Sequence, residues 1–366
     1  MNKLKIELPT FPQSEDMWDR LAREERPIVV YGMGNGADKL IERFGKYGIK
    51  ISDFFASDGF VRGHSFRGFR VMSFSEIKEK YEDFVIVLSF ASNRREVIDM
   101  LSAMDEDYDM LVPDMPVCDT EEYFDKNFYN ENYEKIVAAQ DALCDDFSKN
   151  LYSSIIWFKL TGRMKYIMNF TSEKSEIYSL LNPQKNRIIV DAGAYNGDTL
   201  AEARAYFPNL EKAYAIEPDS RNFKKLARYC EAENGFEINP INAAVWSEVS
   251  LGSFSDSGNR NSTVSATASY EHRKTEVRLM SIDSLSLDEV DYVKYDVEGA
   301  EHEALLGSDK TILGCRPTLL VSLYHRSRDI FFLVNYLREK YPFYKLCLRR
   351  ISCLPAWEID LILTTT

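Results

Sequence analysis

The sequence predicts an α/β protein in which two regions of alternating strands and helices flank a helical segment. Short apolar runs recur in both regions, each followed by a turn and an amphipathic stretch, and this spacing is typical of parallel sheets covered by helices. The chain has 366 residues, 45% of them hydrophobic, which suffices for two cores. We therefore expect a small α/β domain at 1–116, a helical connector at 117–186 and a larger α/β domain at 187–366.

The first domain begins with an apolar strand at 27–31, a turn that contains Gly32, Gly34 and Gly36, and a helix to about residue 47. Further segments are expected as strands at 49–55 and 84–89 and as helices around 75–80 and 94–104. This order predicts a Rossmann-like domain. Its glycines depart from G-x-G-x-x-G by one position, and Asp53 lies near the end of the second expected strand. A nucleotide-sugar site and a purely structural domain both remain open.

The connector lacks the alternating β pattern. From 119 to 181 the chain is charged, with aromatic residues at helical spacing, and such spacing usually marks packing rather than a ligand site. We expect helices that pack on one or both of the neighbouring domains.

The larger domain starts at Arg187 and again alternates strands with helices. Strands are expected at 188–190, 213–216, 238–244, 291–295 and 318–323, and helices at 197–207, 220–233, 300–306 and 329–339. The end differs, because 343–350 and 357–364 are both strand-like and are joined by a short loop. This pattern predicts a parallel sheet that closes with an antiparallel hairpin.

Charge and cysteine content limit the partners. The net charge of −13 disfavours a phosphate backbone, so we expect no nucleic-acid partner. The six cysteines are scattered without a C-x-x-C pair, which favours reduced thiols in a cytoplasmic protein. No apolar stretch approaches the ~20 residues of a membrane span. The sequence is compatible with a homo-oligomer.

The most informative motif is Val190–Thr199, which reads VDAGAYNGDT. An apolar strand ends in Asp191, the chain turns at Gly193, and a helix follows Gly197. Glycines at such a turn let the backbone approach a ligand at the carboxyl end of a sheet. The motif predicts nucleoside binding near residue 191.

Three further motifs follow in order, AIEPD at 215–219, SIDSL at 281–285 and VKYDVEGAE at 293–301. Together with the first motif and the closing hairpin, they resemble the FkbM-type S-adenosylmethionine-dependent methyltransferases over about 187–364. The resemblance implies a class I methyltransferase fold, with a seven-stranded, mostly parallel sheet, and S-adenosyl-L-methionine as the methyl donor.

The motifs nominate site residues. Glu217, at the end of the second strand of this sheet, is expected to bind the ribose hydroxyls. The full set of expected cofactor-binding residues is Asp191, Gly193, Ala194, Tyr195, Gly197, Glu217, Pro218, Asn242, Ala243 and Asp296. His325 and Asp296 are the catalytic candidates, His325 as a base or a substrate clamp. We expect no metal ion, although Asp296, Glu298 and His325 could supply ligands.

The acceptor is less defined. The resemblance implies O-methylation of a sugar, a glycan precursor or a related small molecule. The polar stretch 253–274 is expected to face it, with hydroxyls for a polyol and Arg260, His272, Arg273 and Lys274 for an attached phosphate. Two alternatives remain open: a noncatalytic partner that binds a nucleotide sugar or the cofactor, and an NAD(P)-dependent oxidoreductase that works through the Gly32 loop.

Overall fold

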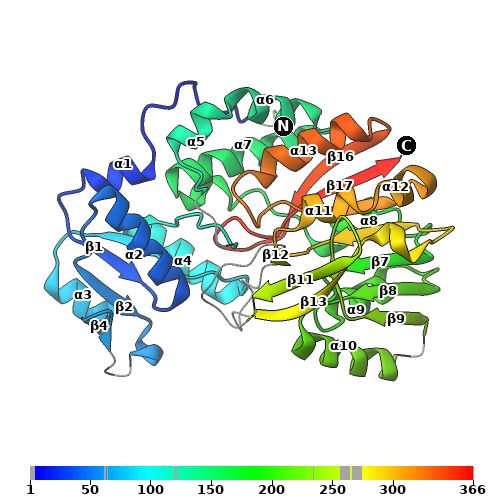
Figure 1. Ribbon diagram of the computed structural model, residues 1–366. Helices are drawn as coiled ribbons and strands as arrows, with labels where there is room; N and C mark the ends of the chain where they lie inside the picture. The colour runs from blue at the N-terminus through cyan, green and yellow to red at the C-terminus, as the bar shows by residue number, and fades with distance from the viewer. Residues whose placement is uncertain are drawn as a thin grey trace.

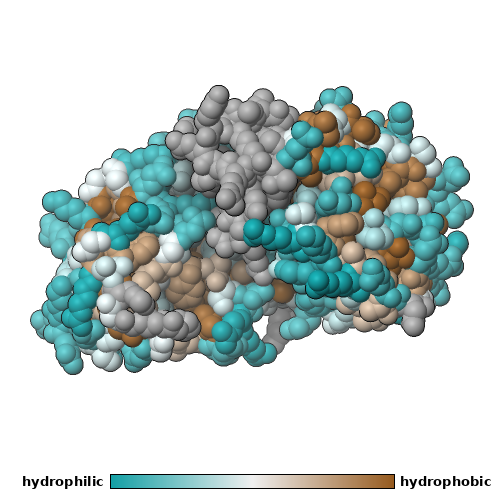
Figure 2. All heavy atoms as spheres, turned by 60° about the horizontal axis from the view of Figure 1, so that its bottom comes forward, coloured by the Kyte–Doolittle hydropathy of each residue, from teal (hydrophilic) through white to brown (hydrophobic). Residues whose placement is uncertain are grey.

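The computed structural model describes residues 5–61, 63, 65–118, 122–233, 235–255, 264–265 and 274–365. Figure 1 shows two sheets side by side, the first in blue and the second in green to red, with helices of the middle of the chain above them. Within the described residues no helix is long and apolar enough to cross a bilayer. Hydrophilic residues cover much of the described surface in the view of Figure 2.

The first sheet has the strand order β3-β4-β2-β1-β5-β6 and is parallel except for β3. Its strands are β1 (Ile28–Tyr31), β2 (Asp53–Ala56), β3 (Ser65–Phe66), β4 (Phe69–Ser73), β5 (Val85–Leu88) and β6 (Asp109–Leu111). The helices around it are α1 (Met17–Ala22), α2 (Asn35–Tyr47), α3 (Phe74–Lys80) and α4 (Arg95–Asp107). The strands expected at 27–31, 49–55 and 84–89 correspond to β1, β2 and β5. The other three are short or contain charged residues, which weakens their pattern.

The glycines of the first turn pack a helix against the sheet. An added Cβ on Gly36 would lie 2.0 Å from the carbonyl oxygen of Ser89, so α2 approaches the end of β5 closely. Asp53 begins β2 instead of ending it, and its carboxylate accepts a hydrogen bond from Lys80 at 2.7 Å. Nucleotides bind at the carboxyl ends of parallel strands, so Asp53 is at the wrong end to bind a ribose. The expectation that placed it near the strand end is corrected.

The middle of the chain is helical, as expected. It contains α5 (Lys126–Glu131), α6 (Tyr133–Ala142), α7 (Asp146–Thr161) and α8 (Lys174–Leu180). Helix α6 packs on α13 (Asp329–Lys340), and α7 packs on β16 (Tyr344–Arg350). A bridge between Leu143 and Leu346 adds backbone to the β16 edge of the second sheet. One hydrophobic cluster runs from the first sheet through these helices into the second sheet, so domain boundaries at 116 and 186 stay a prediction.

The second sheet has the order β16-β17-β15-β14-β7-β8-β9. Its strands, besides β16, are β7 (Ile188–Ala192), β8 (Lys212–Ile216), β9 (Glu237–Ile241), β14 (Tyr292–Tyr295), β15 (Thr318–Ser322) and β17 (Ile359–Thr365). Five neighbouring strands are parallel, and β17 runs antiparallel to both β15 and β16. The predicted mostly parallel sheet with an antiparallel closing hairpin is therefore confirmed.

Helices cover both faces of this sheet. They are α9 (Asp198–Tyr206), α10 (Ser220–Ala232), α11 (Glu301–Leu306), α12 (Asp309–Cys315) and α13. Alternate residues of a strand point to opposite faces. Ile189, Tyr292, Leu320 and Ile362 accordingly join the hydrophobic cluster that contains Ile177 of α8. Their strand neighbours Val190, Val293 and Val321 join the larger cluster on the other face.

A small sheet follows β9, with the order β10-β13-β11-β12. Its strands are β10 (Ala244–Val245), β11 (Ser250–Ser255), β12 (Val264–Ser265) and β13 (Lys274–Met280). Strands β11 and β13 pair antiparallel, so an extended hairpin occupies part of the stretch for which the sequence indicated only an irregular segment. Most of the expected acceptor loop at 253–274, with Arg260, His272 and Arg273, lies outside the described residues.

Candidate functional site

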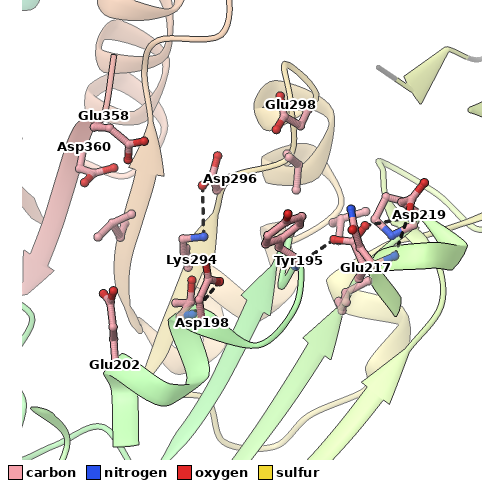
Figure 3. A pocket seen from close by; sticks show the side chains of 18 of the residues that line it. Tyr195, Asp198, Glu202, Glu217, Asp219, Lys294, Asp296, Glu298, Glu358 and Asp360 are labelled. Carbon is pink, nitrogen blue, oxygen red and sulfur yellow. Dashed lines mark hydrogen bonds and ion pairs between the residues drawn. The ribbon is translucent and has the colours of Figure 1, made fainter. Parts of the chain in front are cut away.

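A cavity of about 670 Å³ opens at the carboxyl ends of the central strands of the second sheet. This volume is in the usual range for small-molecule sites, about 300–1,000 Å³. The cavity lies where strand order reverses, between β7 and β14, which is the ordinary ligand position in open parallel sheets. Figure 3 shows acidic side chains on both sides of it. The carboxylates in its wall are Asp198, Glu202, Glu217, Asp219, Asp296, Glu298, Glu358 and Asp360.

The turn after β7 brings two strand ends into contact. Gly193 has φ +92°, and an added Cβ would lie 1.9 Å from the carbonyl oxygen of Asp296. The N–H groups of Gly193 and Ala194 both donate to the carbonyl of Ile216 at 3.0 Å. These two amides are therefore occupied within the sheet. Gly193 lines the cavity, whereas Ala194 is buried behind it, because its methyl group packs in the core below the turn.

The rest of the turn forms one lip of the cavity. Tyr195 has φ +47° and is 45% exposed, and the ammonium nitrogen of Lys225 lies 5.5 Å from the centre of its ring. Gly197, with φ +93°, is the residue from which α9 starts, and an added Cβ would lie 2.7 Å from the Tyr229 ring. Tyr195 lines the cavity. Gly197 does not line the cavity. It allows α9 to pack closely against Tyr229 of α10.

Glu217 follows β8, and its carboxylate is fixed by the backbone. One oxygen accepts from the N–H of Tyr195 at 2.9 Å, and the other accepts from the N–H of Asp219 at 2.9 Å. Burial raises the pKa of Glu217 to about 7, although these two hydrogen bonds favour the charged form. Each oxygen retains a second lone pair. The side chain therefore presents two oriented acceptors to the cavity that it lines.

Asn242 stabilises this loop from behind. Its amide nitrogen donates to the carbonyl of Glu217 at 2.8 Å and to that of Pro218 at 3.2 Å. Pro218 and Ala243 line the cavity, but Asn242 does not. Because its amide nitrogen is used on the backbone, the structure gives Asn242 a role in positioning the Glu217 loop, and its direct contact with the cofactor stays a prediction.

Three charged side chains meet between β7 and β14. Asp191 is 1% exposed, and neither of its carboxylate oxygens accepts a hydrogen bond within the described residues. The ammonium nitrogen of Lys294 lies 3.8 Å from Asp191 and 3.2 Å from Asp296. Burial raises the pKa of Asp191 to about 6, against the attraction of Lys294. Asp296 lines the cavity and Asp191 lies beneath it, since Asp191 is still within the strand.

Lys294 stays charged in this setting. Burial disfavours its ammonium, but the carboxylates of Asp296 and Asp191 outweigh burial and raise its pKa. Burial likewise opposes ionisation of Asp296, yet Lys294 and His325 hold its pKa below the ordinary value. Asp296 also accepts a hydrogen bond from the Tyr324 hydroxyl at 3.2 Å. It is therefore a carboxylate at neutral pH.

His325 follows β15 and is 1% exposed. Its Nε2 lies 3.5 Å from Asp296 and 3.6 Å from Glu298, and its Nδ1 lies 2.9 Å from Glu301. Burial alone would lower the pKa of His325, but the three carboxylates outweigh burial and raise it to about 10. At neutral pH the ring is an imidazolium without a free lone pair. It does not line the cavity, so its geometry favours a positioning role over that of a base.

Residues 191–341 match the model of the Methyltransferase FkbM domain. This part of the chain is similar to the FkbM methyltransferases. The match includes the Gly193 turn, Glu217, Asp296 and His325. The predicted family resemblance and the prediction of a methyltransferase are thereby confirmed.

One solved structure supports the fold of this methyltransferase over nearly its whole length. The chain is similar to methyltransferase FkbM from Methylobacillus flagellatus KT, with 19% identity, a TM-score of 0.69, and coverage of 94% of this chain and 92% of that one. An rRNA methylase from Streptococcus thermophilus aligns over 52% of this chain and 94% of its own, with 14% identity and a TM-score of 0.34. A comparison with curated proteins returned no match. The α/β fold expected of a class I methyltransferase is confirmed.

Several residues of the methyltransferase cavity were not among the predicted set. Lys294 could have been noticed as a lone cation in an apolar strand. Glu358 and Asp360 reach the cavity from the start of β17, more than 60 residues after Asp296 itself. Their only signal in the sequence was two acids close together at the start of the last expected strand.

Side chains that could bind a metal ion lie close together outside the cavity. Among the described side chains, Cys144, Asp145 and Cys347 form a tight group of candidate ligands, and none of them lines the cavity. Asp296, Glu298 and His325 do not form such a group.

Proposed function

We propose that this methyltransferase binds S-adenosyl-L-methionine in the described cavity and methylates a hydroxyl of a sugar, a glycan precursor or a related metabolite. The observation that carries the proposal is the Glu217 carboxylate, which two backbone N–H groups orient at the end of β8. Two vicinal ribose hydroxyls match two oriented carboxylate acceptors. When bound, S-adenosylmethionine would supply an electrophilic methyl group on a sulfonium.

Different residues of the cavity wall would bind the ribose, the adenine and the sulfonium of this donor. Glu217 would accept hydrogen bonds from the ribose, and Pro218, Ala243 and Ile216 offer apolar contacts for the adenine. Gly193 lets the turn approach the backbone of Asp296, and the Asp296 carboxylate lines the cavity. Carboxylates there favour a cationic group electrostatically. The residues present fit the donor.

The chain's own residues would act mainly by positioning. Asp296 is ionised, so it can accept a hydrogen bond from an acceptor hydroxyl and orient its oxygen. Lys294, Tyr324 and His325 fix Asp296 in place. Orientation of two reactants can lower a barrier by several kcal/mol, commonly more than proton transfer does.

Calorimetric titration with S-adenosylmethionine and S-adenosylhomocysteine tests the donor. Glu217→Ala should weaken binding at least about tenfold, since hydrogen bonds to a charged group contribute about 1.5–3 kcal/mol. Glu211→Ala is the matched control, because Glu211 is exposed and pairs with Arg187 at 3.0 Å, outside the cavity. Lack of binding by folded wild-type protein, or equal affinity in both variants, would refute the proposal.

A further inference from the structure

The cavity extends past the proposed donor site toward β17 and α8. On this side its wall includes Tyr292, Leu320, Ile351, Glu358 and Asp360. In the sheet β17 lies two strands away from β14, the strand that ends at Asp296, and farther still from the Glu217 loop. We call these five residues the β17 chamber. It lies on the side of Asp296 away from Glu217, so it is the part of the cavity that the proposed donor site leaves for an acceptor.

One polar side chain is buried and points into this chamber without a partner. Tyr292 is 3% exposed and lines the cavity, yet its hydroxyl makes no hydrogen bond within the described part of the chain. Tyr292 and Lys294 share the α8 face of β14, and register places Asp360 on the same face. Burial, with Asp191 and Asp360 nearby, raises the pKa of Tyr292, so the hydroxyl keeps its proton. An unpaired hydroxyl in a cavity wall is suited to a polar ligand.

Within the described residues, the charge of Asp360 is not balanced by an ion pair. Lys174 pairs with Glu202, and Lys294 pairs with Asp296. The two other cations in the cavity wall, Arg221 and Lys225, belong to α10 at the far end beyond β8. Asp360 makes no ion pair or hydrogen bond among the described residues.

The surroundings of Asp360 are acidic on balance. Burial, Glu358 and Asp296 raise its pKa to about 8, against the opposing effect of Lys294 and His325. A cation that binds beside Asp360 would relieve this penalty.

We propose that the methyl acceptor carries a protonated nitrogen, which the β17 chamber holds between Asp360 and the Tyr292 hydroxyl. The proposal rests on the proposed function and narrows its acceptor class to an amino sugar or a similar amine-bearing polyol. It disfavours a phosphorylated acceptor, because an anion would lie beside the Asp360 carboxylate. A shared divalent ion fits less well, since these carboxylates do not gather with a third ligand among the described residues.

The test uses protein saturated with S-adenosylhomocysteine and four probes, namely glucosamine, glucose, glucose 6-phosphate and magnesium chloride, in calorimetry at pH 7. Glucosamine should bind more tightly than the other three. Asp360→Asn and Tyr292→Phe should each weaken glucosamine binding, Asp360→Asn by about tenfold or more. Glu211→Gln is the matched control, because this exposed carboxylate pairs with Arg187 outside the cavity, and it should leave glucosamine binding within about twofold.

Each result decides the inference. Equal or tighter binding of glucose, glucose 6-phosphate or magnesium would overturn it, and so would the absence of glucosamine binding. Unchanged glucosamine affinity in both Asp360→Asn and Tyr292→Phe would overturn it as well. Both variants should bind S-adenosylhomocysteine like the wild type, which shows that they fold. Failure of the wild type to bind S-adenosylhomocysteine would instead refute the proposed function beneath it.

Discussion

Gly193→Ala is the sharpest test of the turn between β7 and α9. The added methyl would lie 1.9 Å from the Asp296 carbonyl oxygen, and that oxygen must retreat to at least 3.0 Å before the contact is tolerable. At φ +92° an alanine also meets the left-handed penalty, about 1–2 kcal/mol. Overpacking adds about 1–3 kcal/mol. We therefore expect a loss of about 2–5 kcal/mol in the free energy of unfolding.

Urea denaturation followed by circular dichroism measures this loss, and titration with S-adenosylmethionine measures its effect on the site. The matched control is Gly314→Ala, in α12, where an added Cβ meets no atom within 4 Å. It should be neutral or stabilising by up to about 1 kcal/mol, because alanine favours helix. This expectation would be refuted if Gly193→Ala had the same urea midpoint of unfolding as the wild type and bound S-adenosylmethionine with the same affinity.

Two further predictions concern residues behind the cavity wall. The pKa of His325 is about 10 in the fold and about 6.5 unfolded, so its contribution is complete below pH 6.5 and disappears as pH rises through 10. His325→Gln should therefore flatten the fall in stability between these values by up to about 1.4 kcal/mol per pH unit. Urea melts at pH 6, 8 and 10 check this, and an unchanged slope would contradict it. Asn242→Ala removes two hydrogen bonds to the Glu217 loop and should weaken S-adenosylmethionine binding about five- to tenfold, with little change in melting temperature. Unaltered affinity in calorimetry would show that the loop holds its shape without the amide.

Local patterns in the sequence predicted the second sheet well. Apolar runs bounded by turns gave five parallel strands, and the turn at Gly193 was visible as a strand that ends in an acid and a glycine. The hairpin of β11 and β13 was missed. Its strands are polar and antiparallel, so they lack the apolar run that marks a buried parallel strand.

The site was less predictable, because its chemistry depends on distant segments. A histidine after a strand end suggests a base, whereas the fold places Asp296, Glu298 and Glu301 around His325 and keeps it protonated. Asn242 also occurs at the expected strand end, but its direction depends on the loop after β8. Neither outcome could be derived from spacing, since both depend on which backbone and side-chain groups the tertiary structure brings within hydrogen-bond distance.

The position of Lys294 gives the donor side and the acceptor side of the cavity different electrostatic environments. Its ammonium offsets the charges of Asp191 and Asp296 below the centre of the cavity, while Asp360 on β17 has no comparable partner among the described residues. A neutral residue at 294 would leave the buried Asp191 carboxylate without its nearby cation, which typically costs several kcal/mol, and would leave Asp296 with His325 alone. Lys294 therefore lets Asp296 stay ionised beside the reacting atoms. Asp360 in the β17 chamber is a carboxylate that Lys294 does not pair with. A positively charged acceptor would therefore be stabilised most strongly there.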